Sequence, residues 1–263
     1  MSSDAVRLEI EDGVATITLN EPDSMNALSS AIVSGVADAL DEAEADGDVR
    51  CLVLQGAGPA FCAGGDISGM GAGSDRSQHD DVRRIVGLCE ELPIRIFNFG
   101  VPTVAKVDGY CVGAGMGLAL ACDAVLASER STFGLVFRNI GLSVDLTTSY
   151  LVPRLIGPQK AKEITLTGEL IEGPRAEEMG LVNHAYPDDE FEARADEFVE
   201  TIAEGPTVAL SYSMQNIDRG LDGGIREAAE RESDAQAIAK ATADHLEGVE
   251  AFSEDRDPDF EGQ

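Results

Sequence analysis

A run of glycines that leads into an apolar segment is the feature that most restricts how this chain can fold. The run lies within Asp108–Asp123 and has glycine at positions 109, 113, 115 and 117. Glycine allows sharp turns and close approach of a ligand or another chain segment. Because the apolar residues predict a helix over Gly115–Ala121, the first backbone N–H groups of that helix are expected to be unpaired and to favour negative charge.

A second glycine-rich segment, Ala60–Ile67, is typical of a strand that ends in a turn with exposed backbone N–H groups. Two such groups converging on one oxygen would form an oxyanion hole, worth ~3–4 kcal/mol of transition-state stabilisation per donor. From glycine content alone, tight helix packing is the competing interpretation. The dinucleotide-binding fingerprint is not met, because position 118 after Gly113 and Gly115 is leucine.

The rest of the chain predicts an α/β core followed by helices. Alternating residues flank an Asp12-Gly13 turn, which is typical of a hairpin, and apolar residues at helical spacing follow. Strands are expected at Arg7–Ile10, Val14–Leu19, Cys51–Leu54, Thr103–Val107 and Ala124–Ala127, a helix at Ser29–Ala45, and a loop at Gly69–Ser77.

After Glu190 the pattern is helical. We expect helices over Phe191–Ala203, Thr207–Asp218 and Gly224–His245, and an extended tail over Ser253–Gln263. We therefore divide the chain into an α/β core of residues 1–195 and a helical module of residues 196–263.

Charge and cysteine content restrict the possible partners and compartment. The 263 residues include 19 basic and 49 acidic ones, a formal net charge of −30, which argues against nucleic-acid binding and predicts a halophilic surface whose self-repulsion salt screens. Five cysteines without a Cys-x-x-Cys pair favour a reducing cytoplasm. The start of the chain lacks an apolar leader, and the longest uncharged stretch, Gly109–Cys122, is too short to cross a bilayer. We expect no membrane partner.

Taken in order, a series of motifs resembles the crotonase (enoyl-CoA hydratase/isomerase) superfamily over nearly the whole chain. The motifs are Asn26–Leu28, Ala60–Ile67, Gly109–Asp123, Phe133–Gly134, Pro153–Gly157, Leu166–Gly168, Gly180–Asn183 and Asp244–Phe252. The resemblance implies a spiral core of ββα units, a C-terminal helical module for trimerisation, and a homotrimer or a dimer of trimers. It also implies an acyl-CoA thioester substrate, with coenzyme A entering as part of that substrate and no other cofactor.

The resemblance further assigns the site. The two oxyanion-hole N–H groups correspond to Gly65 and Ala114. The family usually has glycine at position 114, and alanine keeps the N–H if its φ is negative. We expect substrate contacts at Ala63, Asp66, Ile67, Met70, Phe137 and Leu142.

Two departures from the family pattern change the predicted reaction. Related hydratases carry two catalytic glutamates at the positions of Gly117 and Phe137, and neither residue here can transfer a proton. Isomerases of the family have a proton-shuttling aspartate at the position of Asp145. We therefore predict an enoyl-CoA isomerase in which Asp145 moves a proton between C2 and C4. The competing interpretation is that Asp145 caps a helix, which would lower its pKa and weaken it as a base. Apolar Leu142 and Val144 nearby would oppose that lowering of the pKa.

Other activities stay open. A hydratase could use Asp145 with another acidic group, and a non-catalytic acyl-CoA binder would need no base. An aromatic dehalogenase is disfavoured, because Glu90 and Phe137 replace that enzyme's histidine and tryptophan. Among the remaining candidates, Cys62 is expected to be buried packing, Asp66 to cap the next helix, and Arg138 to pair with a carboxylate rather than with CoA phosphates. No metal motif is present.

Overall fold

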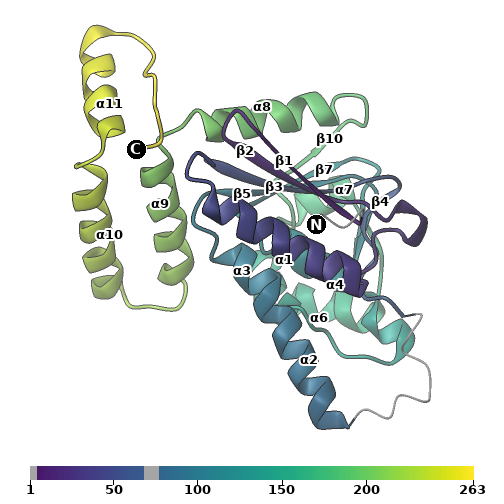
Figure 1. Ribbon diagram of the computed structural model, residues 1–263. Coiled ribbons are helices and arrows are strands. Elements are labelled where there is room, and N and C mark those ends of the chain that lie inside the picture. Colours follow the sequence, from purple (N-terminus) through teal and green to yellow (C-terminus); the bar gives the residue numbers. More distant parts are fainter. Residues whose placement is uncertain (1–4, 68–76) are drawn as a thin grey trace.

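The computed structural model describes residues 5–67 and 77–263, and within them ten strands form two sheets (Figure 1). The larger sheet has the order β1-β2-β3-β5-β7-β10 and the smaller one β4-β6-β8-β9. In the larger sheet β1 and β2 pair antiparallel and the other neighbours pair parallel. The strands are β1 (Val6–Glu11), β2 (Val14–Leu19), β3 (Cys51–Gly56), β4 (Ala60–Cys62), β5 (Thr103–Val107), β6 (Tyr110–Val112), β7 (Ala124–Ser128), β8 (Thr132–Gly134), β9 (Ile171–Glu172) and β10 (His184–Tyr186).

The helices cover the sheets and extend beyond them. They are η1 (Pro22–Ser24), α1 (Ser30–Ala45), α2 (Gln78–Glu91), α3 (Pro93–Phe97), α4 (Ala114–Ala119), η2 (Val136–Ile140), α5 (Thr148–Ile156), α6 (Pro158–Thr167), α7 (Gly173–Glu178), α8 (Phe191–Ala203), α9 (Thr207–Gly220), α10 (Ile225–Ala239) and α11 (Ala243–Glu254). The five predicted strands and the first predicted helix are confirmed, with Ser29 as the N-cap of α1. Residues 69–76 of the predicted loop lie outside the described residues, and Ser77 caps α2.

Three consecutive strand pairs step from the larger sheet to the smaller one. β3 leads to β4, β5 to β6, and β7 to β8, each through a short turn. Gly109 has a φ of 82°, and a Cβ at this position would overlap the carbonyl group of Pro59. Only glycine fits such a turn. A helix follows each pair, which confirms the ββα units that the resemblance implies.

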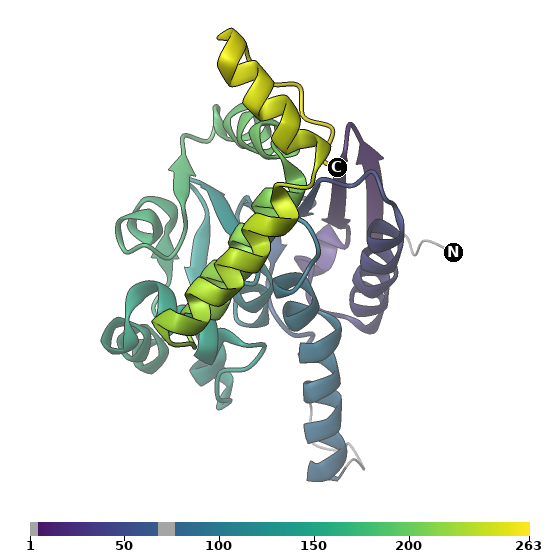
Figure 2. The same ribbon diagram turned by 90° about the vertical axis from the view of Figure 1, so that its left-hand side faces the viewer.

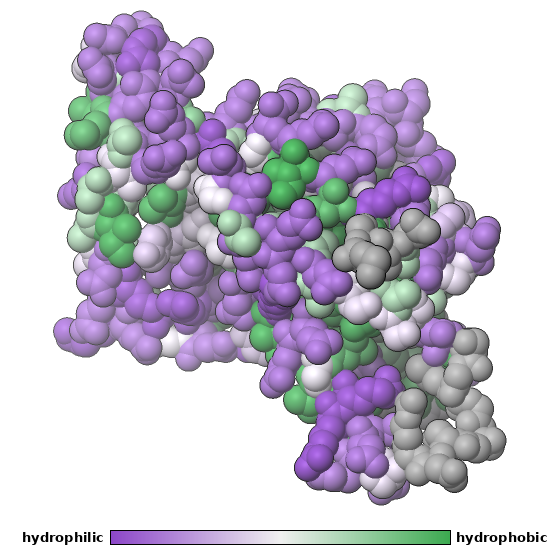
Figure 3. Space-filling view, in the orientation of Figure 1, coloured by the Kyte–Doolittle hydropathy of each residue, from purple (hydrophilic) through white to green (hydrophobic). Residues whose placement is uncertain are grey.

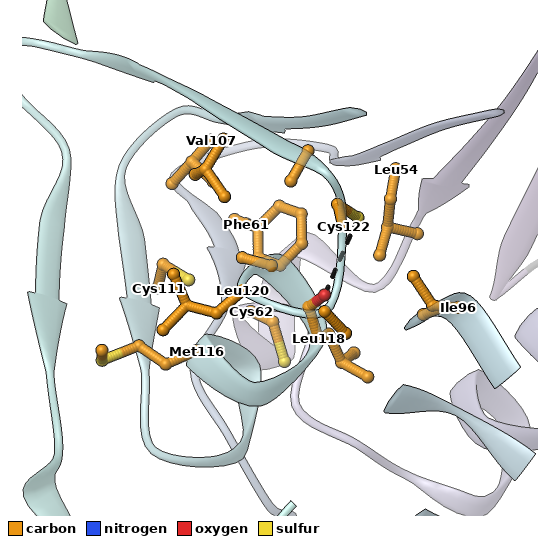
Figure 4. Packing of buried hydrophobic residues seen from close by; sticks show 14 of the residues in the cluster. Leu54, Phe61, Cys62, Ile96, Val107, Cys111, Met116, Leu118, Leu120 and Cys122 are labelled. Atoms are coloured by element: carbon orange, nitrogen blue, oxygen red, sulfur yellow. Dashed lines mark hydrogen bonds between the residues drawn. The ribbon is translucent and has the colours of Figure 1, made fainter. Parts of the chain in front are cut away.

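Between the two sheets lies a dense apolar core. Figure 4 shows part of it, with Phe61, Cys62, Cys111 and Cys122 packed among leucine, isoleucine and methionine side chains. Burial raises the pKa of the Cys62 thiol to about 12. The thiol is therefore inert at neutral pH, which confirms that Cys62 is a buried packing residue.

The far face of the larger sheet is covered by α8. Successive residues of β3 point to opposite faces, so that Leu52 packs in the main core while Cys51 and Val53 pack against α8. Lys106 on β5 reinforces this contact, because its Nζ bonds Glu192 at 2.7 Å and Asp196 at 2.8 Å. The predicted boundary after residue 195 thus falls inside a helix whose buried face belongs to the sheet.

Helices α9, α10 and α11 stand beside the body, and Figure 2 shows them from that side. The single helix predicted over Gly224–His245 is wrong: α10 ends at Ala239 and α11 begins at Ala243. Thr242 causes the restart, because its side chain accepts the backbone N–H of His245 at 3.1 Å. The first two residues of the predicted tail, Ser253 and Glu254, belong to α11. The residues after them are non-helical, as predicted, and are fixed by the buried Asp244, which accepts the N–H groups of Glu261 and Gly262.

Hydrophilic side chains cover most of the face seen in Figure 3. In the described part of the chain, no helix is both long and apolar enough to span a bilayer.

Candidate active site

The two glycine-rich segments lie side by side because their strands are neighbours. β4 and β6 pair in parallel, with Ala60 opposite Tyr110 and Cys62 opposite Cys111, so their carboxyl ends reach the same edge. The turns that follow are in backbone contact. A Cβ on Gly64 would lie 3.3 Å from the backbone nitrogen of Ala114 and 3.0 Å from the carbonyl oxygen of Val112.

The turn after β4 is fixed by hydrogen bonds to the segment before α1. Ala63 donates its N–H to Met25 at 3.0 Å, and Leu28 donates to Gly64 at 2.8 Å. The side chain of the fully buried Asn26 holds the same region through the carbonyl groups of Ala57 and Ala60. The position of Gly65 is therefore set by three residues of the Met25–Leu28 segment.

The turn after β6 presents the start of α4. Gly113 has φ 56° and ψ −126°, a conformation reserved for glycine, and it aims the next N–H outward. Ala114 is the first residue of α4 and is not among the residues of positive φ. The negative φ that an alanine needs at this position is therefore present. Within the described residues neither the Gly65 nor the Ala114 N–H has a hydrogen-bond partner.

These turns open into a pocket of about 730 Å³. All predicted site residues in the described part of the chain line it: Ala63, Gly65, Asp66, Ile67, Ala114, Phe137, Leu142 and Asp145. Met70, the remaining predicted contact, lies outside the described residues.

Asp145 is half-buried, lines the same pocket and lies just before α5. Its Oδ1 is buried without a hydrogen-bond partner in the described structure. The side chain does not cap α5: only its backbone carbonyl accepts bonds, from the Thr148 N–H at 3.1 Å and the Thr148 hydroxyl at 2.7 Å. Burial raises the pKa of Asp145, against the opposing charge of Arg84, so the carboxylate is a stronger base than a capping aspartate.

At position 117 the structure leaves no room for a second carboxyl group. A Cβ on Gly117 would overlap the carbonyl oxygen of Leu146 and lie 2.8 Å from the Leu146 Cβ. Phe137 is buried, with its ring tip 4.0 Å from where a Gly113 Cβ would stand. The absence of both glutamates is thus built into the packing, because apolar groups occupy the space.

A wall of the pocket that the sequence did not predict comes from α2. Asp81, Arg84, Ile85 and Leu88 line it. Their spacing of three, four and seven residues describes one helix face, a signal that was available in the sequence. The apolar pattern of α2 is nevertheless weak, because none of its residues is buried in the core.

The helix cap predicted at Asp66 stays a prediction, because residues 68–76 lie outside the described residues. The next described helix, α2, is capped by Ser77 through a reciprocal pair of bonds with Asp80. One predicted role near the pocket is wrong. Arg138 does not pair with a carboxylate; it donates to the carbonyl groups of Leu166 at 2.7 Å and Thr167 at 2.9 Å, at the end of α6. In the part of the chain that is described, no group of three or more His, Cys, Asp or Glu residues could hold a metal ion.

Comparison with known proteins gives consistent matches over the full chain. The sequence profile of the enoyl-CoA hydratase/isomerase family matches residues 9–263. The 1,2-epoxyphenylacetyl-CoA isomerase of Escherichia coli is 31% identical, covering 97% of both chains. Enoyl-CoA hydratase domain-containing protein 2 of mouse is 35% identical over 95% of this chain and 85% of its own. The crystal structure of an enoyl-CoA hydratase/isomerase from Cupriavidus metallidurans superimposes with a TM-score of 0.92 at 29% identity, over 100% of this chain and 98% of that one.

Proposed function

Because the chain belongs to the enoyl-CoA hydratase/isomerase family, whose members act on acyl-CoA substrates, we propose that it is an enzyme that shifts a carbon–carbon double bond of an enoyl-CoA. The observation that carries the proposal is the contrast between Asp145 and Gly117. Asp145 presents a buried, unpartnered carboxylate oxygen at the pocket, while Leu146 fills the space that a carboxylate side chain at position 117 would need.

The proposed reaction begins at the thioester carbonyl, which accepts hydrogen bonds from the backbone N–H groups of Gly65 and Ala114. Asp145 removes a proton from C2 of a 3-enoyl-CoA, and the electron pair forms the C1–C2 double bond of an enolate whose charge lies on the carbonyl oxygen. In the reverse direction the proton leaves C4 of a 2-enoyl-CoA, and the electron pair reaches the same oxygen through the C2–C3 double bond. The resulting enolate is stabilised by ~3–4 kcal/mol per backbone donor. The protonated Asp145 then returns the proton at the other carbon, so one carboxyl group completes the cycle without water.

Hydration of a 2-enoyl-CoA is the second candidate. Two further carboxylates, Asp66 and Asp81, line the pocket and could act with Asp145 on a water molecule. The relative named for a hydratase domain matches this chain as well as the isomerase does, so both reactions belong in one test.

The test compares 3-enoyl-CoA and 2-enoyl-CoA as substrates in buffered high salt. We expect conversion of the 3-enoyl-CoA, and loss of about 10²- to 10⁴-fold in kcat for Asp145→Asn with retained affinity for the CoA ester. Asp81→Asn is the matched control and should keep isomerase turnover. Full isomerase turnover in Asp145→Asn would refute the mechanism. Water addition that depends on Asp81 would instead favour the hydratase, and binding without turnover the non-catalytic alternative.

We further propose that the enzyme acts in the cytoplasm as a homotrimer or a dimer of trimers, with coenzyme A as part of its substrate. Support comes from α9–α11, where apolar side chains remain uncovered. Leu246, Val249 and Phe252 lie at three-residue spacing on α11, and Phe252 is 90% exposed. Light scattering of the full chain in high salt measures the mass and checks the assembly.

A further inference from the structure

The wall that α2 contributes to the pocket stands next to the turn that carries Asp145. Arg84, Ile85 and Leu88 occupy the pocket-facing side of this helix. One residue beyond Leu88, burial raises the pKa of the Cys89 thiol, and the nearby backbone of Leu146 and Thr147 opposes this effect. Leu88 and Leu146 line the same pocket, so α2 lies beside the turn that carries Asp145.

Arg84 is the basic side chain that lines the pocket within the described residues. It has no ion pair or hydrogen bond in the described structure, although acidic residues outnumber basic ones by 49 to 19. Asp145 has the complementary property, because its Oδ1 is buried without a partner. Two opposite charges that lack other partners thus face one cavity.

We propose that Arg84 is a positioning residue that keeps Asp145 ionised in the substrate-free enzyme, so that the carboxylate can accept the substrate proton. The inference rests on the proposed role of Asp145 as proton shuttle. Burial favours the protonated form of Asp145, and a positive charge in the same cavity favours the carboxylate. The opposing effects of burial and of Arg84 on the Asp145 pKa agree with this assignment.

The other titratable groups around Asp145 cannot replace Arg84. Asp81 on α2 and Asp66 after β4 line the pocket but are acidic, so their charge opposes ionisation of Asp145. Cys89 is a thiol whose pKa burial raises, and it is neutral at physiological pH. Positive charge at this wall therefore depends on Arg84.

The experiment titrates the side-chain carboxyl carbon of Asp145 by NMR in protein labelled with ¹³C-aspartate, the signal being assigned by its loss in Asp145→Asn. In Arg84→Gln the signal should titrate at higher pH than in the wild type, and Arg84→Lys should return it towards the wild-type value. Arg83→Gln is the matched control: it removes the same charge one residue away, from an exposed side chain that does not line the pocket. The shift should shrink as salt screens the exposed guanidinium.

The inference is overturned if Arg84→Gln titrates as the wild type does, or if Arg83→Gln shifts the signal equally, which would indicate a net-charge effect. A second measurement follows kcat/KM against pH, where the acidic limb of Arg84→Gln should move to higher pH. Because the NMR titration needs no substrate, a shifted signal without isomerase turnover would refute the proposed reaction and leave the electrostatic role of Arg84 intact.

Discussion

The two residues after Asp145 adopt a backbone conformation that few side chains tolerate. Leu146 and Thr147 have φ values of 46° and 61°, and such residues cost about 1–3 kcal/mol each. The cost is offset locally: Leu146 is 2% exposed and packs on Gly117, and Thr148 holds the carbonyl group of Asp145. The strained turn fixes the direction of the Asp145 side chain, which a flexible loop could not do.

Gly117→Ala tests whether this turn depends on the absence of a side chain at position 117. The added methyl group would overlap the Leu146 carbonyl, a backbone atom that cannot move freely, so we expect ~1–3 kcal/mol loss in the free energy of unfolding and a lower kcat. Gly87→Ala on α2 is the control, because nothing lies within 4 Å of its Cβ position. That variant should be stabilised by about 0.5–1 kcal/mol. Denaturant unfolding measures both, and equal effects would contradict the packing argument.

Ala114→Pro removes one oxyanion-hole donor while keeping a residue that the first helical position accepts. Proline lacks the N–H, and its fixed φ suits the first position of a helix, which Ala114 occupies in α4. We expect kcat to fall by about 10²- to 10³-fold with little change in affinity for the CoA ester. Ala114→Gly keeps the N–H and should keep turnover. Activity in the proline variant equal to the glycine variant would remove Ala114 from the oxyanion hole.

At the scale of elements, the contact between α9 and the core contains two like charges. Burial and the negative charge of Asp123 raise the pKa of Asp218 on α9 from 3.8 to about 6. Asp123, at the end of the α4 segment, is itself held by the N–H and hydroxyl groups of Thr103. The folded state therefore binds a proton at Asp218 more tightly than the unfolded chain does.

This shift gives the stability of the protein a definite pH dependence. Between pH 3.8 and about 6 the native state holds more protons, so the contribution of Asp218 to stability is present at low pH and lost as pH rises through 6. Asp218→Asn should raise Tm above pH 6, with the gain disappearing below pH 4. Asp222→Asn should act oppositely, because hydrogen bonds from Tyr150 and Arg154 lower the pKa of Asp222. Melting curves across this range decide; a pH-independent gain in Asp218→Asn would contradict the assignment.

For the whole molecule, the net charge of −30 sets the response to salt. The screening length falls from about 30 Å at ~0.01 M to about 3 Å at ~1 M salt, so self-repulsion of the folded surface should weaken steeply over this range. We expect Tm to rise with KCl concentration and any oligomer to dissociate at low salt. Sucrose at matched osmolality is the control, because it does not screen charge. An unchanged Tm and an unchanged mass after dialysis into low salt would exclude a halophilic surface.

Much of the local structure could be predicted because its causes are local. Alternation and a turn dipeptide define the β1–β2 hairpin, and helical spacing after Ser29 defines α1. The break between α10 and α11 was missed, since Thr242 ends one helical pattern and caps the next without any change in polarity. The α2 wall was missed as well, because a helix exposed along most of its length has a weak apolar pattern.

By itself the sequence determined the backbone possibilities: glycine at 113 permits the turn, alanine at 114 keeps an N–H, and no carboxyl group exists at 117 or 137. Only the tertiary structure decided that Gly65 and Ala114 lie together, because this follows from the parallel pairing of two strands nearly fifty residues apart in the chain. It alone also showed that the Asp145 side chain does not cap α5. One carboxylate oxygen is buried without a partner, Thr148 bonds the backbone carbonyl instead, and Arg84 opposes the effect of burial on the Asp145 pKa. No local sequence pattern relates these residues to one another.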